Sequence, residues 1–189
     1  MGGVFFGANC AKIGFAGWKI QSMAKIKLEG NWHTGIAYDL HTISSEHLGF
    51  DEQGHDIFDN KRSEMGELVY RLKYRSDQNA VKRIIELLDD IKGIENFDFL
   101  VPIPATKKRN VQPVDLITKK LGARRNVKVI SDNLVNDGTE ELKGVTDPIE
   151  RDDLLKAALS LSEPMMFSNR SVLLVDDLYR SGSTLRIAT

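Results

Sequence analysis

Two adjacent carboxylates directly follow an apolar run near the carboxyl end of the sequence. Residues 172–175 read VLLV, and Asp176 and Asp177 come next. Because unpaired charge at the end of a buried strand is unfavourable, such a pair needs a ligand or a hydrogen-bond partner. Adjacent carboxylates can accept hydrogen bonds from ligand hydroxyls, or bind Mg²⁺ directly or through water. The alternative is that both side chains only cap the following loop and helix.

The loop after the carboxylates has the composition of an anion site. It combines a cation, three hydroxyl groups and a glycine in Arg180, Ser181, Gly182, Ser183 and Thr184. A helix is expected to start here with Ser181 as its N-cap, and N–H groups at a helix N-terminus attract phosphate. The loop is too short for a nucleotide-binding P-loop, and no lysine follows its glycine. We therefore expect it to bind a single phosphate.

A second polar loop follows another expected strand. Residues 101–104 read VPIP, and the basic segment after them contains Ala105, Thr106, Lys107, Lys108 and Arg109. In α/β sheets, ligands bind beyond the carboxyl ends of the strands, so two such loops indicate one shared site. The alternative for this segment is an ordinary solvated basic turn.

The spacing of apolar residues predicts the elements that position these loops. From Ser63 a helical spacing places Met65, Leu68, Val69 and Leu72 on one face. Helices are expected at residues 63–75, 79–93, 114–122 and 149–161. Strands are expected at residues 97–104, 127–132 and 171–177, one or two more within residues 32–45, and a loop at residues 47–60. The alternation predicts an α/β domain with a doubly wound, mostly parallel sheet.

The segment VLLVDDLYRSGST resembles the phosphoribosyl pyrophosphate (PRPP) motif of type I phosphoribosyltransferases, with four apolar residues, two acids and a small-residue turn. Three other segments resemble the ComF-type subgroup, which is linked to competence and DNA uptake. They are GELVYRLKYRSD, a helix that ends in Lys73 and Tyr74; LVPIPATKKRNVQ; and ELKGVTDPIERDDLLKAAL, a Lys-Gly segment before an Arg-bearing helix. The resemblance covers residues 60–189 and, more faintly, residues 30–60.

The resemblance implies a role for each matching residue. Asp176 and Asp177 would hold the ribose 2′- and 3′-hydroxyls with Mg²⁺ nearby, and residues 180–184 would bind the 5′-phosphate. The pyrophosphate loop would comprise Ala105, Thr106 and Lys107, with added charge from Lys108 and Arg109. Residues 135–148 would close over the reaction with Lys143 as their cation, or would be a plain surface loop. Lys73 is the weakest of these candidates, because a lysine at a helix end is usually just exposed.

Three features depart from the family pattern. Arg180-Ser181 replaces a pair of threonines, and residues 109–113 read RNVQP where the family has Arg-Gly-Phe-Asn-Gln. The Cys-rich zinc element of many ComF-type proteins is also missing, because Cys10 is the only cysteine. The first departure could alter the affinity for phosphate. The other two weaken the assignment to the ComF-type subgroup.

Residues 30–60 are expected to form a small N-terminal hood over an acceptor base, which the sequence does not identify. The aromatic side chains of residues 32–41 could stack on a base or belong to the core. All four histidines fall here, and the spacing of His33, His41, His47 and His55 matches no standard metal site. We assign no metal to them.

The family resemblance also suggests the domain boundaries. Residues 1–29 are expected to be an N-terminal extension, with disorder as one outcome, and residues 61–189 the α/β core. A domain of this kind would need one or more further strands after residue 189. Otherwise the strand that carries Asp176 would lack a neighbour on one side and leave an exposed edge.

The resemblance implies a Mg²⁺-dependent enzyme that transfers the 5-phosphoribosyl group from PRPP to a nitrogenous acceptor and releases pyrophosphate. A non-catalytic PRPP-binding regulator and a ComF-like accessory protein in DNA uptake are the alternatives, and a homodimer is left open. The formal net charge of −1 gives no general support for nucleic acid binding. One cysteine and no apolar run of about 20 residues favour a cytoplasmic protein without a membrane partner.

Overall fold

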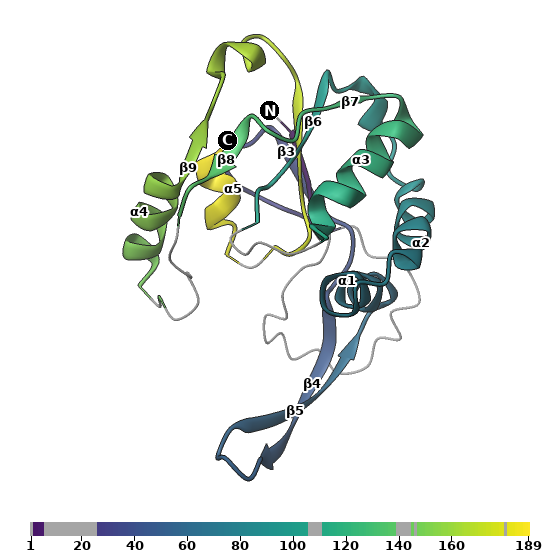
Figure 1. Cartoon of the computed structure of the whole chain (residues 1–189), viewed down its shortest axis with the longest axis vertical. Helices are drawn as coiled ribbons and strands as arrows, with labels where there is room; N and C mark the ends of the chain where they lie inside the picture. Colours follow the sequence, from purple (N-terminus) through teal and green to yellow (C-terminus); the bar gives the residue numbers. More distant parts are fainter. Residues whose placement is uncertain (1, 6–25, 106–110, 139–144, 146, 180) are drawn as a thin grey trace.

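The computed structural model describes residues 2–5, 26–105, 111–138, 145, 147–179 and 181–189 of the chain. These residues form a mixed α/β structure around one six-stranded sheet (Figure 1). The strand order is β2 (Ile26–Lys27), β3 (Thr34–Ala37), β1 (Gly2–Phe5), β10 (Val172–Asp176), β6 (Phe99–Pro102) and β7 (Lys128–Val129). Neighbouring strands are parallel except β2 and β3, which are antiparallel. The predicted α/β class with a mostly parallel sheet is therefore confirmed.

Strand β10, which carries Asp176, has a neighbour on each side. Val175 is aligned with Val4 of β1 and with Pro102 of β6. The prediction that this strand lacks one neighbour is wrong, because a segment from the start of the chain fills that position. The prediction that the domain begins at residue 30 is also wrong, since β1 and β2 belong to the central sheet.

Both faces of β10 are buried, which explains its uninterrupted apolar sequence. Leu173 and Val175 belong to the hydrophobic cluster on one face of the sheet, and Val172 and Leu174 belong to the cluster on the other. A strand covered on both faces has no solvent-facing positions and therefore no alternation of polar residues.

Three helices contribute to the first cluster: α1 (Glu64–Arg75), α2 (Asn79–Leu88) and α3 (Pro113–Arg125). The predicted apolar face of α1 is buried, and Met65 is completely inaccessible. The Ser63 side chain caps this helix by accepting a hydrogen bond of 3.0 Å from the Gly66 N–H. A short 3₁₀ turn, η1 (Ile94–Asn96), leads into β6.

Helix α3 continues past Gly122, where the sequence predicts its end. It ends at Arg125, and Asn126 forms the left-handed C-cap with φ 54°. Gly122 has a packing role instead, because a Cβ there would lie 2.3 Å from Cγ2 of Val129 and 2.8 Å from the Val127 carbonyl oxygen. The glycine thus lets α3 pack closely against the segment that contains β7.

The second cluster lies under the N-terminal segment and the last helix. Leu28, Trp32 and Leu185 are buried there, the last of them in α5 (Ser183–Ala188). Phe167, at the end of the 3₁₀ turn η2 (Pro164–Phe167), packs against the same cluster. The sheet is therefore buried on both sides.

Helix α4 (Pro148–Ala158) belongs to the segment that connects β7 to β10. Its base is an antiparallel pair of short strands, β8 (Leu134–Asn136) and β9 (Leu159–Leu161). The helix expected over residues 149–161 thus ends three residues early, where the chain becomes β9. The strand expected over residues 127–132 is reduced to the two residues of β7.

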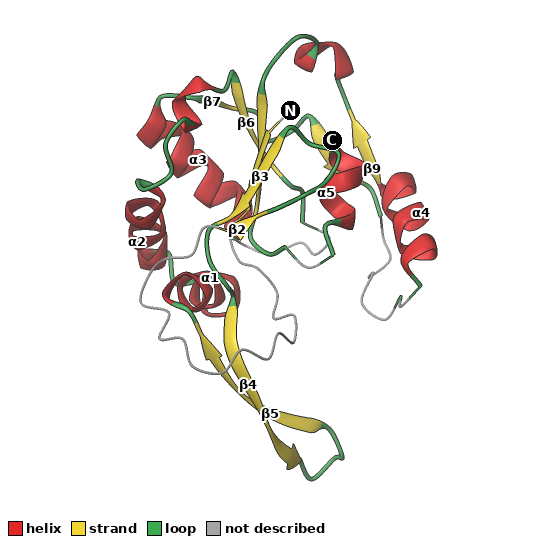
Figure 2. Cartoon of the chain, turned by 180° about the vertical axis from the view of Figure 1, so that it is seen from behind, coloured by secondary structure: helices red, strands yellow, loops and turns green. Residues whose placement is uncertain are grey.

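Residues 42–62 form a long hairpin of β4 (Thr42–Phe50) and β5 (Asp56–Arg62), which extends away from the sheet (Figures 1 and 2). The prediction of a loop over residues 47–60 is wrong. The hairpin is largely exposed on both faces, so its strands lack the alternating pattern on which strand prediction depends. A turn at Asp51 closes it, where the Gly54 N–H donates to the Asp51 carbonyl oxygen at 3.0 Å. No helix among the described residues has the length and apolar character needed to span a membrane.

Candidate functional site

The carboxyl ends of β6 and β10 lie side by side, as expected for parallel neighbours. The Ile103 N–H donates to the Val175 carbonyl oxygen at 2.8 Å, one residue beyond the last aligned pair. The two polar loops predicted to share a site therefore start next to each other. Ala105 is described and exposed, whereas Thr106, Lys107, Lys108 and Arg109 lie outside the described residues.

A small cavity of about 70 Å³ lies where β10 leads into α5. Four of the five residues predicted to bind phosphate line it, and the fifth, Arg180, lies outside the described residues. Asp176 and Arg151 also line the cavity. Its lining comprises Arg151, Asp176, Leu178, Tyr179, Ser181, Gly182, Ser183, Thr184 and Leu185. The structure thus joins the first carboxylate and the predicted phosphate loop around one space.

The shape of this loop depends on Gly182. It has a φ of 77°, and a Cβ added there would lie 2.8 Å from the Tyr179 hydroxyl oxygen. Gly182 rather than Ser181 is the N-cap residue of α5, so the prediction of Ser181 as the cap is wrong. The Ser181 hydroxyl instead lies 3.1 Å from the Ser183 hydroxyl, with which it shares a hydrogen bond.

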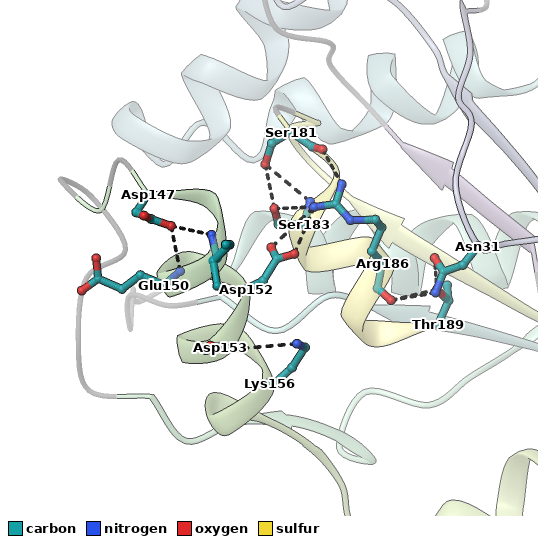
Figure 3. Close-up of polar contacts among 11 residues, drawn as sticks. Asn31, Asp147, Glu150, Asp152, Asp153, Lys156, Ser181, Ser183, Arg186 and Thr189 are labelled. Atoms are coloured by element: carbon teal, nitrogen blue, oxygen red, sulfur yellow. Dashed lines mark hydrogen bonds and ion pairs between the residues drawn. The ribbon is translucent and has the colours of Figure 1, made fainter.

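Arg186 of α5 holds the loop through hydrogen bonds and links it to α4 (Figure 3). Its guanidinium donates to the Ser181 carbonyl oxygen and to the Ser183 hydroxyl, each at 3.0 Å. The same guanidinium forms an ion pair of 3.3 Å with Asp152 on α4. The Ser183 hydroxyl and then Arg186 lower the pKa of Asp152 by stabilising its carboxylate. The loop is therefore held by side chains from two helices.

The second carboxylate is engaged by a lysine. Lys73, at the end of α1, donates to Oδ2 of Asp177 at 2.8 Å, and their side chains are only 20% and 10% exposed. The alternative that Lys73 is simply an exposed helix-end lysine is therefore wrong. Because the two residues lie far apart in the sequence, no local pattern reveals the pair. It ties α1 to the loop that follows β10.

The first carboxylate has different surroundings. Oδ1 of Asp176 accepts a hydrogen bond of 2.8 Å from the Asp177 N–H. Burial, followed by the neighbouring charge of Asp177, raises the pKa of Asp176 to about 7, although nearby Lys73 acts in the opposite direction. Asp176 is thus poised between the protonated and ionised forms near neutral pH, and it faces the cavity.

The structure leaves one carboxylate at the cavity, that of Asp176, for a Mg²⁺ ion that a ligand would bring with it. Among the described residues, no group of three or more His, Cys, Asp or Glu side chains is placed to hold a metal. Mg²⁺ is commonly held by one or two carboxylates together with the phosphates of a substrate. Asp176 could supply one such oxygen at the cavity, while the Asp177 carboxylate is already paired with Lys73.

Two aromatic residues of the predicted hood belong to the core. Trp32 is 7% exposed, and its indole N–H donates to the Leu28 carbonyl oxygen at 3.1 Å. Tyr38 is completely buried, and burial is the main reason that its pKa is raised to about 12. Phe50 and Phe58 on the hairpin are exposed, and both rings contact His47.

The sequence points only weakly to two of the charged residues that the structure places at this site. Lys73 is the weakest candidate of the family resemblance, and Arg151 lies in the Arg-bearing helix with no role assigned to it. Lys143, the predicted cation of the closing loop, lies outside the described residues. Of that loop, Val135 and Asn136 belong to β8.

The chain was also compared with known proteins. No family model, no curated protein and no solved structure matches it.

Proposed function

We propose that this chain binds PRPP and transfers its 5-phosphoribosyl group to a nitrogenous acceptor, with release of pyrophosphate. One observation carries the proposal: the cavity at the end of β10 joins Asp176 to residues 181–184, the loop that resembles a ribose 5-phosphate motif. The cavity lies beyond the carboxyl end of a parallel strand, which is the usual ligand position in open α/β sheets. The burial of β10 on both faces supports a doubly wound fold of the phosphoribosyltransferase type.

In this proposal the loop binds the 5′-phosphate and Asp176 accepts a hydrogen bond from a ribose hydroxyl. The Lys73–Asp177 ion pair limits the role of the second carboxylate. Had both carboxylates been turned inward into lysine salt bridges, the ribose assignment would have failed. Among the described residues, Lys73 pairs with Asp177 at 2.8 Å and no lysine pairs with Asp176. We therefore assign the ribose contact to Asp176 and a supporting role to Asp177.

The reaction breaks the bond between C1′ of the ribose and the pyrophosphate oxygen, while an acceptor nitrogen forms a new bond to C1′. Positive charge develops on the ribose, and the electron pair leaves with the pyrophosphate. The chain contributes by fixing the ribose phosphate so that C1′ is presented to the acceptor in one orientation. Mg²⁺ bound with the substrate would neutralise charge on the pyrophosphate. No nucleophilic side chain is needed.

Isothermal titration calorimetry with PRPP and Mg²⁺ tests the binding step. We expect the wild-type chain to bind and Asp176→Asn/Asp177→Asn to lose detectable affinity, because the ribose and metal contacts need carboxylate oxygens. Asp153→Asn, an exposed change on α4, is the matched control and should bind as the wild type does. Equal affinity of the double variant and the wild type would reject the assignment.

Turnover with a panel of bases tests the transfer step. Release of pyrophosphate in the presence of a base, and only with Mg²⁺ and PRPP, is the result expected of an enzyme. Tight PRPP binding without pyrophosphate release from any base would instead identify a PRPP-binding regulator.

A further inference from the structure

We propose that Arg151 of α4 binds the phosphate group in the cavity at the end of β10. This inference rests on the proposed function in naming the ligand as a sugar 5-phosphate. It adds a residue from a different segment of the chain to the site that the sequence motif describes. The ligand class is a phosphate monoester whose phosphate enters the cavity.

Arg151 and the loop approach the same cavity from two elements. Ser181, Ser183 and Thr184 line it from the loop and the first turn of α5, and Arg151 lines it from α4. Among the described residues that line the cavity, Arg151 is the basic one. The cavity thus combines hydroxyl residues of the loop with a basic residue of α4, and a planar guanidinium can bind two phosphate oxygens at once.

The start of α4, the helix that carries Arg151, is fixed by a side-chain cap, which Figure 3 shows at Asp147. Asp147 caps α4 by accepting from the Ile149 and Glu150 N–H groups at 2.7 Å and 3.2 Å. The Arg151 N–H donates to the Asp147 carbonyl oxygen at 3.0 Å, in the first turn of the helix. The backbone of Arg151 is therefore fixed in the first turn of α4, so a ligand would need to order only its side chain.

The helix is also fixed relative to the loop. Asp152, the next residue, pairs with Arg186 at 3.3 Å, and Arg186 holds the carbonyl oxygen of Ser181. One turn further along α4, Leu155 is 1% exposed. These contacts define the distance between α4 and the loop, so Arg151 and the loop can act on one phosphate together.

The charge and size of the cavity favour a phosphate monoester. Among the described residues that line it, Arg151 is the basic side chain and Asp176 the acidic one. A guanidinium attracts an anion such as phosphate, and a neighbouring carboxyl group suits the sugar hydroxyls rather than the phosphate. Pockets for drug-sized ligands measure about 300–1,000 Å³, whereas this cavity of about 70 Å³ suits a single phosphate group. The ribose and the acceptor would lie outside it.

Calorimetric titrations of three probes test the inference: inorganic phosphate, ribose 5-phosphate, and PRPP with Mg²⁺. We expect Arg151→Met to weaken binding of each probe about tenfold to a hundredfold, because a charge-assisted hydrogen-bond pair is lost. Arg151→Lys should show a smaller loss, since it keeps the charge but not the paired donors. Lys156→Met is the matched control, because it removes an exposed cation from the same helix, and its affinities should equal those of the wild type.

The three probes separate this inference from the proposed function. If folded Arg151→Met binds PRPP and phosphate like the wild type, the inference fails and the proposed function stands. If phosphate binds in an Arg151-dependent manner but PRPP does not bind, the proposed function fails and the inference stands. If the wild type binds none of the probes, both fail. Circular dichroism checks the fold, and Arg151→Lys decides the outcome if the methionine variant does not fold.

Discussion

Adjacent residues of the same type have different surroundings at the end of β10. The Asp177 carboxylate forms an ion pair with Lys73, whereas the Asp176 carboxylate faces the cavity and accepts a hydrogen bond from the Asp177 N–H. This asymmetry arises because successive residues leaving a strand point in different directions. A ligand at the cavity would therefore meet the first carboxylate, and α1 would stabilise the second.

The raised pKa of Asp176 predicts how stability depends on pH. Because burial and Asp177 raise this pKa from 3.8 to about 7, the folded state favours the protonated carboxyl group. Its contribution to stability is complete below pH 4 and is lost as the pH rises toward 7. Asp176→Asn should remove this loss. The free energy of unfolding of the variant should therefore rise above that of the wild type by about a few kcal/mol as the pH increases from 4 to 7. Urea denaturation across this range measures the difference.

The matched control for this pH series is Asp153→Asn, whose carboxylate is 67% exposed. Its free energy of unfolding should follow the pH dependence of the wild type. A parallel pH dependence for Asp176→Asn and the wild type would show that Asp176 titrates normally in the folded protein.

At the scale of elements, the turn between β10 and α5 depends on one glycine. Gly182→Ala should destabilise this turn, because alanine at φ 77° is strained and its Cβ would meet the Tyr179 hydroxyl. We expect a loss of about 1–3 kcal/mol in the free energy of unfolding, together with weaker phosphate binding. Chemical denaturation and phosphate titration measure the two effects.

Gly54→Ala is the control for Gly182→Ala. Gly54 also has a positive φ, 82°, but a Cβ there would have no atom within 4 Å. This variant should carry the backbone strain alone and bind phosphate normally. If Gly182→Ala left both stability and phosphate binding unchanged, neither the turn nor phosphate binding would require a glycine at residue 182.

Elements with a buried face could be predicted from the sequence, and others could not. The spacing of Met65, Leu68, Val69 and Leu72 predicted the buried face of α1, because each turn of a helix returns to the same side. The β4–β5 hairpin is exposed on both faces and so leaves no such pattern. Gly122 looked like a helix end because close packing and helix termination both favour glycine.

The sequence predicts the consecutive motif residues of the candidate site and the adjacency of the two loops that follow β6 and β10. The motif placed Asp176 beside residues 181–184, and the structure brings them around one cavity. Lys73 and Arg151 reach the site from α1 and α4, so their positions depend on how those helices pack. No local sequence pattern encodes that packing.

At the scale of the whole molecule, strand β1 lies between β3 and β10 and is hydrogen-bonded to both, so it joins the N-terminal strands to the rest of the sheet. Val4→Pro should be strongly destabilising, because Val4 is aligned with both Ile36 and Val175 and proline cannot donate to either strand. We expect a loss of about 3 kcal/mol or more in the free energy of unfolding. Thermal and chemical denaturation should both show it.

A proline at an exposed turn provides the comparison. Glu52 is the second residue of the turn in which the Gly54 N–H bonds to the Asp51 carbonyl oxygen, a position that accepts proline. Glu52→Pro should therefore leave stability close to that of the wild type. Equal stability of Val4→Pro and Glu52→Pro would mean that β1 is not part of the cooperative fold.

The alignment of Gly2 with Leu173 also constrains when the protein can fold during its synthesis. Strand β10 is translated long after its neighbour β1. The sheet therefore lacks one of its central strands while most of the chain is being synthesised. Until β10 arrives, β1 and β6 each expose an edge that can pair with another chain. Such long-range pairing slows folding, and we expect chaperones to raise the yield of native protein.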